Sequence, residues 1–562
     1  MFYSKFYYIL LISILFYPSI IYAQIPKLML DNALHPVACL DHKSNVICSG
    51  VNWIDSYSLV AQKINSLGEF LWADNIGGVT VSCPVNLNDA IFHEPSILPH
   101  EDGKVFFAFE YMEYLNRDDL AKFYYSKPKL QCVGTDGEIL WRENGIDLTN
   151  MTVSLHGGAS ILGIRYDIDK DIMIFWSWLD VDSTRLRPNI ESTYIQKINP
   201  DDGEIILDST GNKLLNEMAW GALLSKNGNS YLMHKRNVLC LNQTGDKVWD
   251  VEIFPDLNFQ NITYPAATND IGDIFTIYVS SGGIRGRLFS AAGEPIWNDT
   301  IIIPGKSEVN SLGPITNWGN DKWVFAVDKN IYCIRRNGKH LWNEEGIAIP
   351  DTGLSKIECI AALDLNNLGL LYNFYPGSGT SLKMQKISIG GELMWDNSGI
   401  FIMEKVATNS IILPDSTGGA YIISDAHAIY EPEIRPRGTY VEKVDRMGNV
   451  GFATSVIKSS KELYPENFVI SKNYPNPFSY MTKIFIDSRI EKYSEFSIVI
   501  YNLLGKEVKR FRMNKEFNTS MQILWDGKDQ FGVDVAEGVY IYQVANSDRV
   551  IATGKMTYLK AN

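Results

Sequence analysis

Acidic residues at alternate positions in DIDKD (167–171) form the first group in this chain that could do chemistry. Three carboxylates at this spacing could bind a calcium ion through their oxygens. The segment lacks the glycine and the distal glutamate of an EF-hand loop, so a solvated turn is the favoured interpretation. The eight histidines are scattered along the sequence without metal-ligand spacing. The sequence therefore predicts no metal site.

Linear catalytic motifs are also absent from the sequence. It contains no H-E-x-x-H, no G-x-S-x-G, no phosphate-binding glycine loop and no C-x-x-C. We therefore expect no cofactor, and no catalytic residues that spacing alone could reveal.

Five of the seven cysteines fall into two groups. Cys39 and Cys48 flank LDHKSNVI symmetrically and would face each other across a hairpin, which is compatible with a disulfide in an oxidising compartment. Cys132, Cys240 and Cys333 each stand five residues before a recurring glycine. We expect these three to be small buried side chains on separate sheets, too far apart to be bridged.

The recurring glycine belongs to a repeat, as in CLNQTGDKVW (240–249), where a strand and a turn are followed by tryptophan four positions after the glycine. The turn glycines lie on average about 54 residues apart, which is within reach of propeller blades that carry insertions. They are Gly68, Gly137, Gly203, Gly245, Gly293, Gly338, Gly391 and Gly448. The docking tryptophans that follow six of them are Trp72, Trp141, Trp249, Trp297, Trp342 and Trp395, with Leu207 and Phe452 in the other two places.

Each repeat also contains short segments in which apolar and polar residues alternate, joined by turns of Gly, Asn and Asp. In one unit they are GALLS (221–225), SYLMHK (230–235), NVLCLN (237–242) and KVWDVEI (247–253). This pattern predicts four antiparallel strands per unit. The sequence therefore predicts an all-β fold, an eight-bladed or alternatively seven-bladed β-propeller over residues 30–456. The turn glycine would supply a positive φ, and the tryptophan would insert between adjacent blades with its indole N–H bound to a neighbouring carbonyl.

The Gly-x-x-x-Trp pattern resembles the tryptophan-docking motif of quinoprotein-like, PQQ-type eight-bladed propellers. The match is partial, because the Thr-Gly pair of those motifs is seen only at Thr244-Gly245. The adjacent cysteine pair that quinone dehydrogenases use is missing. The resemblance therefore implies the fold and not the cofactor.

The repeat ends before a charged linker at 457–467, and a different set of motifs follows the linker. Residues 468–562 resemble the type A C-terminal sorting domain of the Bacteroidota type IX secretion system, through ordered motifs. These motifs are Asn473-Tyr474-Pro475-Asn476-Pro477-Phe478, Tyr501-Asn502-Leu503-Leu504-Gly505, Trp525-Asp526-Gly527, Gly538-Val539-Tyr540 and Lys555-Met556. The alternating strands also predict a small Ig-like β-sandwich. The resemblance implies recognition by the type IX translocon and its sorting and attachment machinery, followed by anchoring to surface lipopolysaccharide or release.

The first residues predict a signal peptide over 1–23, with Lys5 before the apolar core FYYILLISILFY (6–17) and Ala23 at the cleavage site. No later stretch is long and apolar enough to predict a transmembrane segment. The formal net charge of −14 makes nucleic acid an unfavourable partner. These features predict an exported protein that passes through the periplasm to the outer-membrane surface or the medium.

Two functions remain open. The first is a non-catalytic binding or adhesion scaffold that presents loops from one end of the propeller to an extracellular glycan or protein. The alternative is a secreted glycan-active enzyme whose carboxylates converge from different blades without a linear motif. Charged side chains and tyrosines gathered at the centre of the propeller would favour the enzyme, and an apolar centre would favour binding.

Overall fold

The computed structural model divides the chain into two compact units, Met1–Ser455 and Val456–Asn562. Every helix or strand among the described residues is a β-strand, so the predicted all-β class is confirmed. The structure describes residues 27–52, 57–73, 76–83, 95–114, 124–151, 156–182, 187–254, 265–350, 353–375, 381–396, 398–404, 409–426, 438–452, 468–470, 478–488, 496–502, 505–513, 521–546 and 549–560. The predicted signal peptide (1–23) and linker (457–467) lie outside these ranges.

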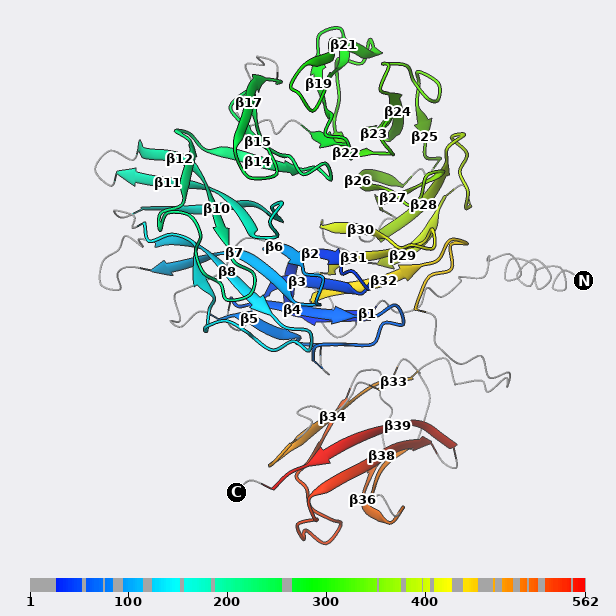
Figure 1. Cartoon of the computed structure of the whole chain (residues 1–562). Helices are drawn as coiled ribbons and strands as arrows, with labels where there is room; N and C mark the ends of the chain where they lie inside the picture. Colours follow the sequence, from blue (N-terminus) through cyan, green and yellow to red (C-terminus); the bar gives the residue numbers. More distant parts are fainter. Residues whose placement is uncertain are drawn as a thin grey trace, which may run out of the picture. The chain divides into compact units, whose positions relative to one another are not determined.

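The first unit is built from antiparallel groups of four strands in chain order (Figure 1). The first group is β2 (Ala33–Leu40), β3 (Val46–Asn52), β4 (Leu59–Ile64) and β5 (Val79–Ser82). An eight-stranded sheet follows: β6 (Ser96–Pro99), β7 (Val105–Tyr114), β8 (Tyr124–Val133), β9 (Ile146–Asp147), β10 (His156–Tyr166), β11 (Ile172–Asp182), β12 (Arg187–Ile198) and β13 (Asn212–Leu215). It consists of two such groups, β6–β9 and β10–β13, which join where β8 and β10 pair in parallel.

The remaining groups of this unit are separate four-stranded sheets. Three of them are β14 (Ala219–Leu224), β15 (Ser230–His234), β16 (Asn237–Leu241) and β17 (Lys247–Glu252); β18 (Ala266–Thr268), β19 (Ile274–Ser280), β20 (Gly283–Phe289) and β21 (Pro295–Pro304); and β22 (Leu312–Asn317), β23 (Lys322–Val327), β24 (Asn330–Arg335) and β25 (Ile347–Ala348). The next is β26 (Leu354–Ala362), β27 (Asn367–Phe374), β28 (Ser381–Ser388) and β29 (Ile400–Glu404). The last contains β30 (Ser410–Pro414), β31 (Ala420–Ala426) and β32 (Gly438–Val444).

The last sheet takes its fourth strand from the opposite end of the unit. β1 (Lys27–Asp31) pairs with β32, and Lys27 lies opposite Val441. The side chains of Met29 and Leu30 are fully buried in a cluster that also contains Val46 and Tyr421. This strand therefore joins the beginning of the unit to its end through both backbone pairing and core packing.

The first strands of successive groups are neighbours in space. β2 contacts β6, and the same relation continues through β10, β14, β18, β22 and β26 to β30, which in turn contacts β2. Figure 1 shows these strands facing a common centre, with the later strands of each group further out.

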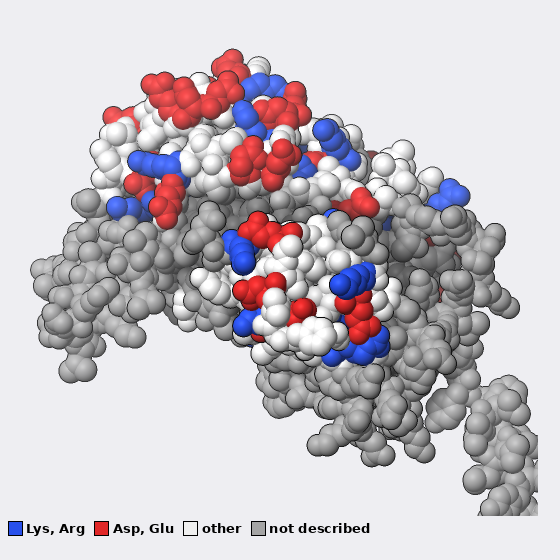
Figure 2. Space-filling view, turned by 90° about the horizontal axis from the view of Figure 1, so that it is seen from below, with Lys and Arg blue, Asp and Glu red and all other residues white. Residues whose placement is uncertain are grey.

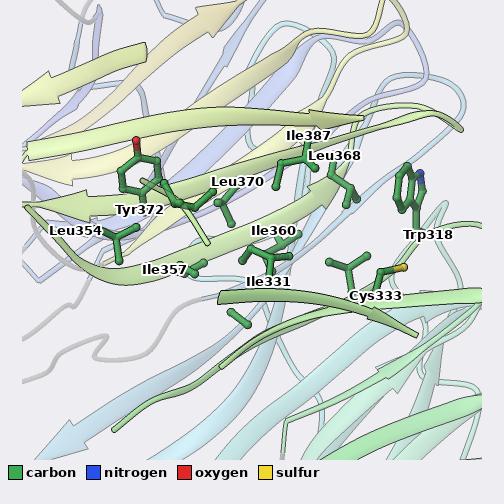
Figure 3. Packing of buried hydrophobic residues seen from close by; sticks show 13 residues of the cluster. Trp318, Ile331, Cys333, Leu354, Ile357, Ile360, Leu368, Leu370, Tyr372 and Ile387 are labelled. Atoms are coloured by element: carbon green, nitrogen blue, oxygen red, sulfur yellow. The ribbon is translucent and has the colours of Figure 1, made fainter. Parts of the chain in front are cut away.

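Apolar side chains fill the space between neighbouring sheets, because strands such as KWVFAV (β23) are buried on both faces. Figure 3 shows one such cluster, in which Ile331 and Cys333 of β24 pack against Ile360 of β26 and Leu370 of β27. Burial of one such aliphatic side chain contributes about 1.5–3 kcal/mol. Comparable clusters lie between the other neighbouring groups of this unit.

The second unit is a β-sandwich of two antiparallel sheets. One sheet is formed by β33 (Phe468–Ile470), β34 (Thr482–Ser488) and β37 (Met521–Trp525), and the other by β36 (Glu507–Met513), β35 (Phe496–Asn502), β38 (Gly538–Asn546) and β39 (Arg549–Tyr558). Ile484 and Ile523 of the first sheet share one core with Ile498, Ile500 and Met556 of the second. The sandwich therefore has a hydrophobic core of its own.

The substitution Leu30→Ala tests how much β1 stabilises the first unit. Leu30 is fully buried, so its truncation should lower the free energy of unfolding by about 2–5 kcal/mol. The matched control is Leu365→Ala, whose side chain is 78% exposed and should change stability by less than about 0.5 kcal/mol. Equilibrium urea unfolding of the full chain measures both, and equal midpoints for the two variants would contradict the assigned role of β1.

Candidate functional site

The turn glycines occupy tight turns between the third strand of each group and the residues that follow. All eight have φ values between 77° and 91°, where a side chain would be strained. At Gly68 the backbone N–H donates to the carbonyl oxygen of Asn65 at 2.9 Å, and Gly293 donates in the same way to Ser290. These backbone conformations explain why the repeat keeps glycine at this position.

A docking tryptophan packs on the turn glycine of the next group. A Cβ atom at Gly293 would lie 2.9 Å from the Trp249 ring, and one at Gly137 would lie 2.8 Å from Trp72. Such contacts require a residue without a side chain. Close approaches of 2.9–3.1 Å also join Trp141 to Gly203, Trp342 to Gly391 and Trp395 to Gly448. Trp297 lies further away, 4.0 Å from where a Cβ of Gly338 would be, which is an ordinary van der Waals contact.

The two positions without tryptophan differ from each other. Phe452 lies 2.8 Å from where a Cβ of Gly68 would be, so the last unit contacts the turn of the first. Gly245 follows the unit that has Leu207, and there the space is filled by Ile195 and Met173 instead. A smaller side chain in the docking position is thus compensated by the neighbouring strands.

Several indole N–H groups bind the same backbone position in the next group. Trp72 donates to the carbonyl of Thr135 at 3.0 Å, and Trp249 donates to that of Ala291 at 3.0 Å. Trp297 and Trp342 donate likewise to the carbonyl oxygens of Arg336 and Ile389. Each acceptor stands two residues before a turn glycine. The bond satisfies the indole while the ring covers the glycine, so this contact fixes neighbouring sheets and has no catalytic chemistry.

The connections between strands differ in length between the two ends of each group. We call the end that carries the turn glycines the turn end and the opposite end the loop end. At the turn end, the first and second strands are joined by four or five residues, as in 225–229. At the loop end, the second and third strands are joined by two residues at 235–236 and by eleven at 427–437. The connection between first and second strands is therefore nearly constant in length, whereas the connection between second and third strands varies, as is typical of a binding end.

The first strands carry few charged residues. Among their described residues these are Arg165 of β10 and Lys356 and Glu358 of β26. Arg165 donates to the carbonyl oxygen of Asn229 at 2.7 Å. Glu358 pairs with Lys356 at 3.2 Å and accepts a hydrogen bond from Asn373 at 2.6 Å. All three are thus engaged in contacts within the fold.

The DIDKD segment forms a turn at the turn end. One oxygen of Asp167 accepts hydrogen bonds from the backbone N–H groups of Asp169 and Asp171, each at 2.9 Å. Its other oxygen pairs with Lys197 at 2.7 Å. The contacts agree with the predicted turn. Among the residues that the structure describes, no group of three His, Cys, Asp or Glu could hold a metal ion.

The hypothesis of a Cys39–Cys48 disulfide is contradicted by the structure, in which both cysteines are unbridged. Cys39 lies opposite Ile47, whereas Cys48 lies opposite Ala38. Because the register is displaced by one residue, the two side chains point to opposite faces of the sheet. Burial is the main cause that raises the pKa of the Cys39 thiol to about 12, and burial also raises the pKa of Cys48.

The other predicted cysteines are buried. Cys132, Cys240 and Cys333 lie on β8, β16 and β24, with exposed fractions of 1% or less. Burial raises the pKa of each thiol to about 12, so these cysteines are chemically inert apolar side chains in the folded chain.

In the second unit, much of the predicted sorting motif lies in the core. Phe478 and Trp525 are buried with ring centroids 5.5 Å apart, and Trp525 donates its indole N–H to the carbonyl of Lys528. Tyr540 packs edge-on against Trp525 and donates its hydroxyl to Ala536. Residues Asn473, Pro475, Asn476 and Pro477 lie outside the described ranges.

Other motif residues form turns. The N–H of Gly505 donates to the carbonyl of Asn502, and Gly505 has a φ of 76°. Gly527 has a φ of 68°, and the ring of Tyr558 lies where its side chain would be. The remaining members, Tyr501, Asp526, Gly538 and Lys555, lie on strands β35, β38 and β39 or in the turn after β37.

The surface is acidic overall, with a formal net charge of −14. Figure 2 shows groups of Asp and Glu side chains on the visible face with Lys and Arg beside them. No helix among the described residues is long and apolar enough to cross a membrane.

Residues 472–557 match the family model of the secretion system C-terminal sorting domain. The chain is therefore exported to the cell surface or secreted, as the sequence predicted. The sorting domain implies interaction with the type IX secretion machinery. No curated protein matches the chain.

Several solved structures were found to be similar to this chain at low identity. A eukaryotic initiation factor shares 12% identity, with 84% of this chain and 97% of that chain covered and a TM-score of 0.37. A puromycin-hydrolyzing peptidase from Mycobacterium tuberculosis shares 9% identity over 72% and 60%, with a TM-score of 0.39. Prolyl oligopeptidase B from Galerina marginata shares 9% over 72% and 56%, with a TM-score of 0.35.

The substitution Trp249→Ala tests the docking contact. Removal of a packed aromatic ring together with its hydrogen bond to Ala291 should cost about 3 kcal/mol of stability. The control is Tyr375→Ala, which removes an aromatic side chain that is 54% exposed and should cost less than about 1 kcal/mol. Urea unfolding measures both, and an unfolding midpoint for Trp249→Ala equal to that of the control would refute the docking role.

The cysteine register gives a second prediction. Alkylation of the purified protein in denaturant without reductant should modify both Cys39 and Cys48, because the register keeps the thiols on opposite faces. Peptide mass spectrometry detects the modification. A peptide pair linked through Cys39 and Cys48 would show that the register is different.

Proposed function

We propose that the first unit is an eight-bladed β-propeller over residues 30–456 and that it acts as a non-catalytic binding scaffold. In this proposal a signal peptide at 1–23 starts export, 457–467 is a linker, and 468–562 is an Ig-like sorting domain. The scaffold is delivered to the cell surface or the medium, where its loop end binds an extracellular ligand.

Eight blades, rather than seven, are supported by the strand groups and by the docking contacts. Each group of four strands supplies one blade, and β1 completes the last of them. The contact of Phe452 with Gly68 continues the docking series from the last blade to the first. A propeller of this kind leaves only short, protected strand edges.

The difference between the two ends of the blades carries the functional proposal. Connections between first and second strands at the turn end keep to four or five residues, while those between second and third strands at the loop end vary from two to eleven. If both ends served only the stability of the fold, the connections between second and third strands would not need to vary in length. Loops that vary on a constant scaffold are the usual way in which binding surfaces are built.

A binding role is favoured over catalysis by the chemistry of the first strands. Hydrolysis of a glycan generally requires two carboxyl groups about 5–9.5 Å apart in one site. The described residues of the first strands contribute one carboxylate, Glu358, and it is engaged by Lys356 and Asn373. This composition supports recognition and gives no support to a central acid–base pair.

The sorting domain accounts for delivery. We propose that its folded surface is recognised by the type IX translocon and that its removal is followed by anchoring to lipopolysaccharide or by release. Because Phe478, Trp525 and Tyr540 are core residues, recognition in this proposal requires the folded sandwich.

The binding proposal is tested with the purified mature protein and immobilised polysaccharides and extracellular proteins. We expect saturable binding of at least one ligand, with the ligand recovered chemically unchanged. Cleavage products that accumulate in proportion to protein concentration would favour the enzyme, and no binding across either class would refute the scaffold.

The delivery proposal is tested by cell fractionation. Deletion of 466–562 should leave the propeller in the periplasm, and Trp525→Asp should do the same because a charge would enter a fully buried position. Trp525→Phe, which keeps an aromatic ring in the core, should still be exported. A truncated chain that reaches the surface or the medium at the normal level would contradict the sorting role.

A further inference from the structure

The loop end of the β14–β17 sheet brings one exposed tryptophan together with a group of polar side chains. Trp220 is 36% exposed, which is more than any other tryptophan among the described residues. It stands near the beginning of β14, where it lies close to the β15–β16 connection at 235–236. Antiparallel pairing places the start of β14, the end of β15 and the end of β17 at the same end of the sheet.

The ring of Trp220 is held in position. It packs against buried Phe254 with ring centroids 5.3 Å apart, and its indole N–H donates to the carbonyl oxygen of Lys235 at 3.4 Å. Phe254 is itself anchored by a backbone hydrogen bond to Arg236 at 2.9 Å. A ring that is fixed on one side and exposed on the other is a preorganised apolar platform.

Beside this platform, His234 connects two carboxylates. Its Nδ1 atom lies 2.5 Å from Glu217, and its Nε2 atom lies 3.1 Å from Asp250. His234 is buried, whereas the Asp250 side chain remains 39% exposed. Asp250 also accepts a hydrogen bond from Asn237 at 2.9 Å. These groups therefore present hydrogen-bond acceptors and donors in fixed positions next to the ring.

The charges around the platform are paired. Lys235 binds Glu217, and Arg236 binds Glu252 at 3.0 Å. Burial acts to raise the pKa of Glu217, but hydrogen bonds from Lys235 and His234 outweigh it, so this carboxyl has a lowered pKa and is ionised at neutral pH. With three carboxylates beside two permanent cations, the region carries no net positive charge that would attract an anionic polymer.

The backbone at this hairpin is strained. Lys235 has a φ of 43°, a conformation that glycine or asparagine usually supplies in a two-residue connection. Lysine at 235 is therefore not the residue that the turn geometry favours. The side chains of Lys235 and Arg236 make the contacts that arrange Glu217 and Glu252.

We propose that this platform binds a neutral polysaccharide, with the C–H face of one sugar ring stacked on Trp220. The sugar hydroxyls would bond to Asp250 and to Lys235 at the edge of the ring. An apolar ring flanked by paired polar groups matches the amphipathic surface of a neutral hexose or pentose unit. This inference rests on the proposed binding function and assigns it a ligand class and a place.

Affinity gel electrophoresis of the full mature chain tests the proposal. The probes are xyloglucan, mixed-linkage β-glucan and galactomannan as neutral polymers, and polygalacturonate as an anionic one. At least one neutral polymer should retard the wild type. Trp220→Ala should weaken that retardation at least about tenfold in Kd, and Trp220→Phe should retain more of it. Asp250→Asn should weaken it less than Trp220→Ala.

The matched control is Tyr375→Ala, which removes another aromatic side chain that is 54% exposed. It should leave retardation unchanged, and circular dichroism should show every variant folded. Retardation by polygalacturonate alone, or by a neutral polymer with Trp220→Ala equal to wild type, would overturn the assignment. Binding of proteins but of no polysaccharide would overturn it while leaving the scaffold proposal intact, and cleavage of a polymer would overturn the scaffold proposal itself.

Discussion

The contact between a docking side chain and the turn glycine of the next group is the constraint on which the first unit depends. It needs two properties of glycine at once. The φ values of 77–91° permit the tight turn, and the missing Cβ allows a ring to approach to within about 3 Å of the place that a side chain would take. Alanine at Gly293 would both strain the turn and displace Trp249, so two costs would add at a single position.

This constraint acts on one end of each group and leaves the other end free. The turn end holds the glycine, the docking contact and connections of nearly constant length between first and second strands, so insertions in these turns would disturb neighbouring sheets. At the loop end the connections between second and third strands differ in length. Stability and ligand recognition can therefore be carried by opposite ends of the same strands. The platform at Trp220 lies at the loop end. The strained backbone of Lys235 is therefore away from the docking contacts between sheets.

The sequence allowed the all-β class and the export of the chain to be predicted, because the repeat and the sorting motif are local patterns. It was less informative wherever register or long-range closure decides the outcome. The symmetric spacing of Cys39 and Cys48 suggested a cross-strand pair, but the five-residue connection at 41–45 displaces the register by one position and turns the thiols apart. The pairing of β1 with β32 joins segments about four hundred residues apart, which no local pattern reveals. The group around His234 was missed for the same reason, since Glu217, His234 and Asp250 come from three separate positions in the chain.

The sorting motif has a related explanation in physical terms. Phe478, Trp525 and Tyr540 pack together, while Gly505 and Gly527 allow turns that other residues would strain. Residues that identify the domain in the sequence are thus largely residues that fold it. A secretion apparatus that depended on those side chains directly would have to reach into a hydrophobic core. In our proposal the motif specifies the sandwich, and the recognised surface consists of exposed residues that the sandwich presents. Among its described residues these include Phe531, which is 80% exposed in a turn held by Asp529. In the delivery that we propose, the sorting domain is recognised only after folding, so the stability of the sandwich is a condition for delivery of the first unit.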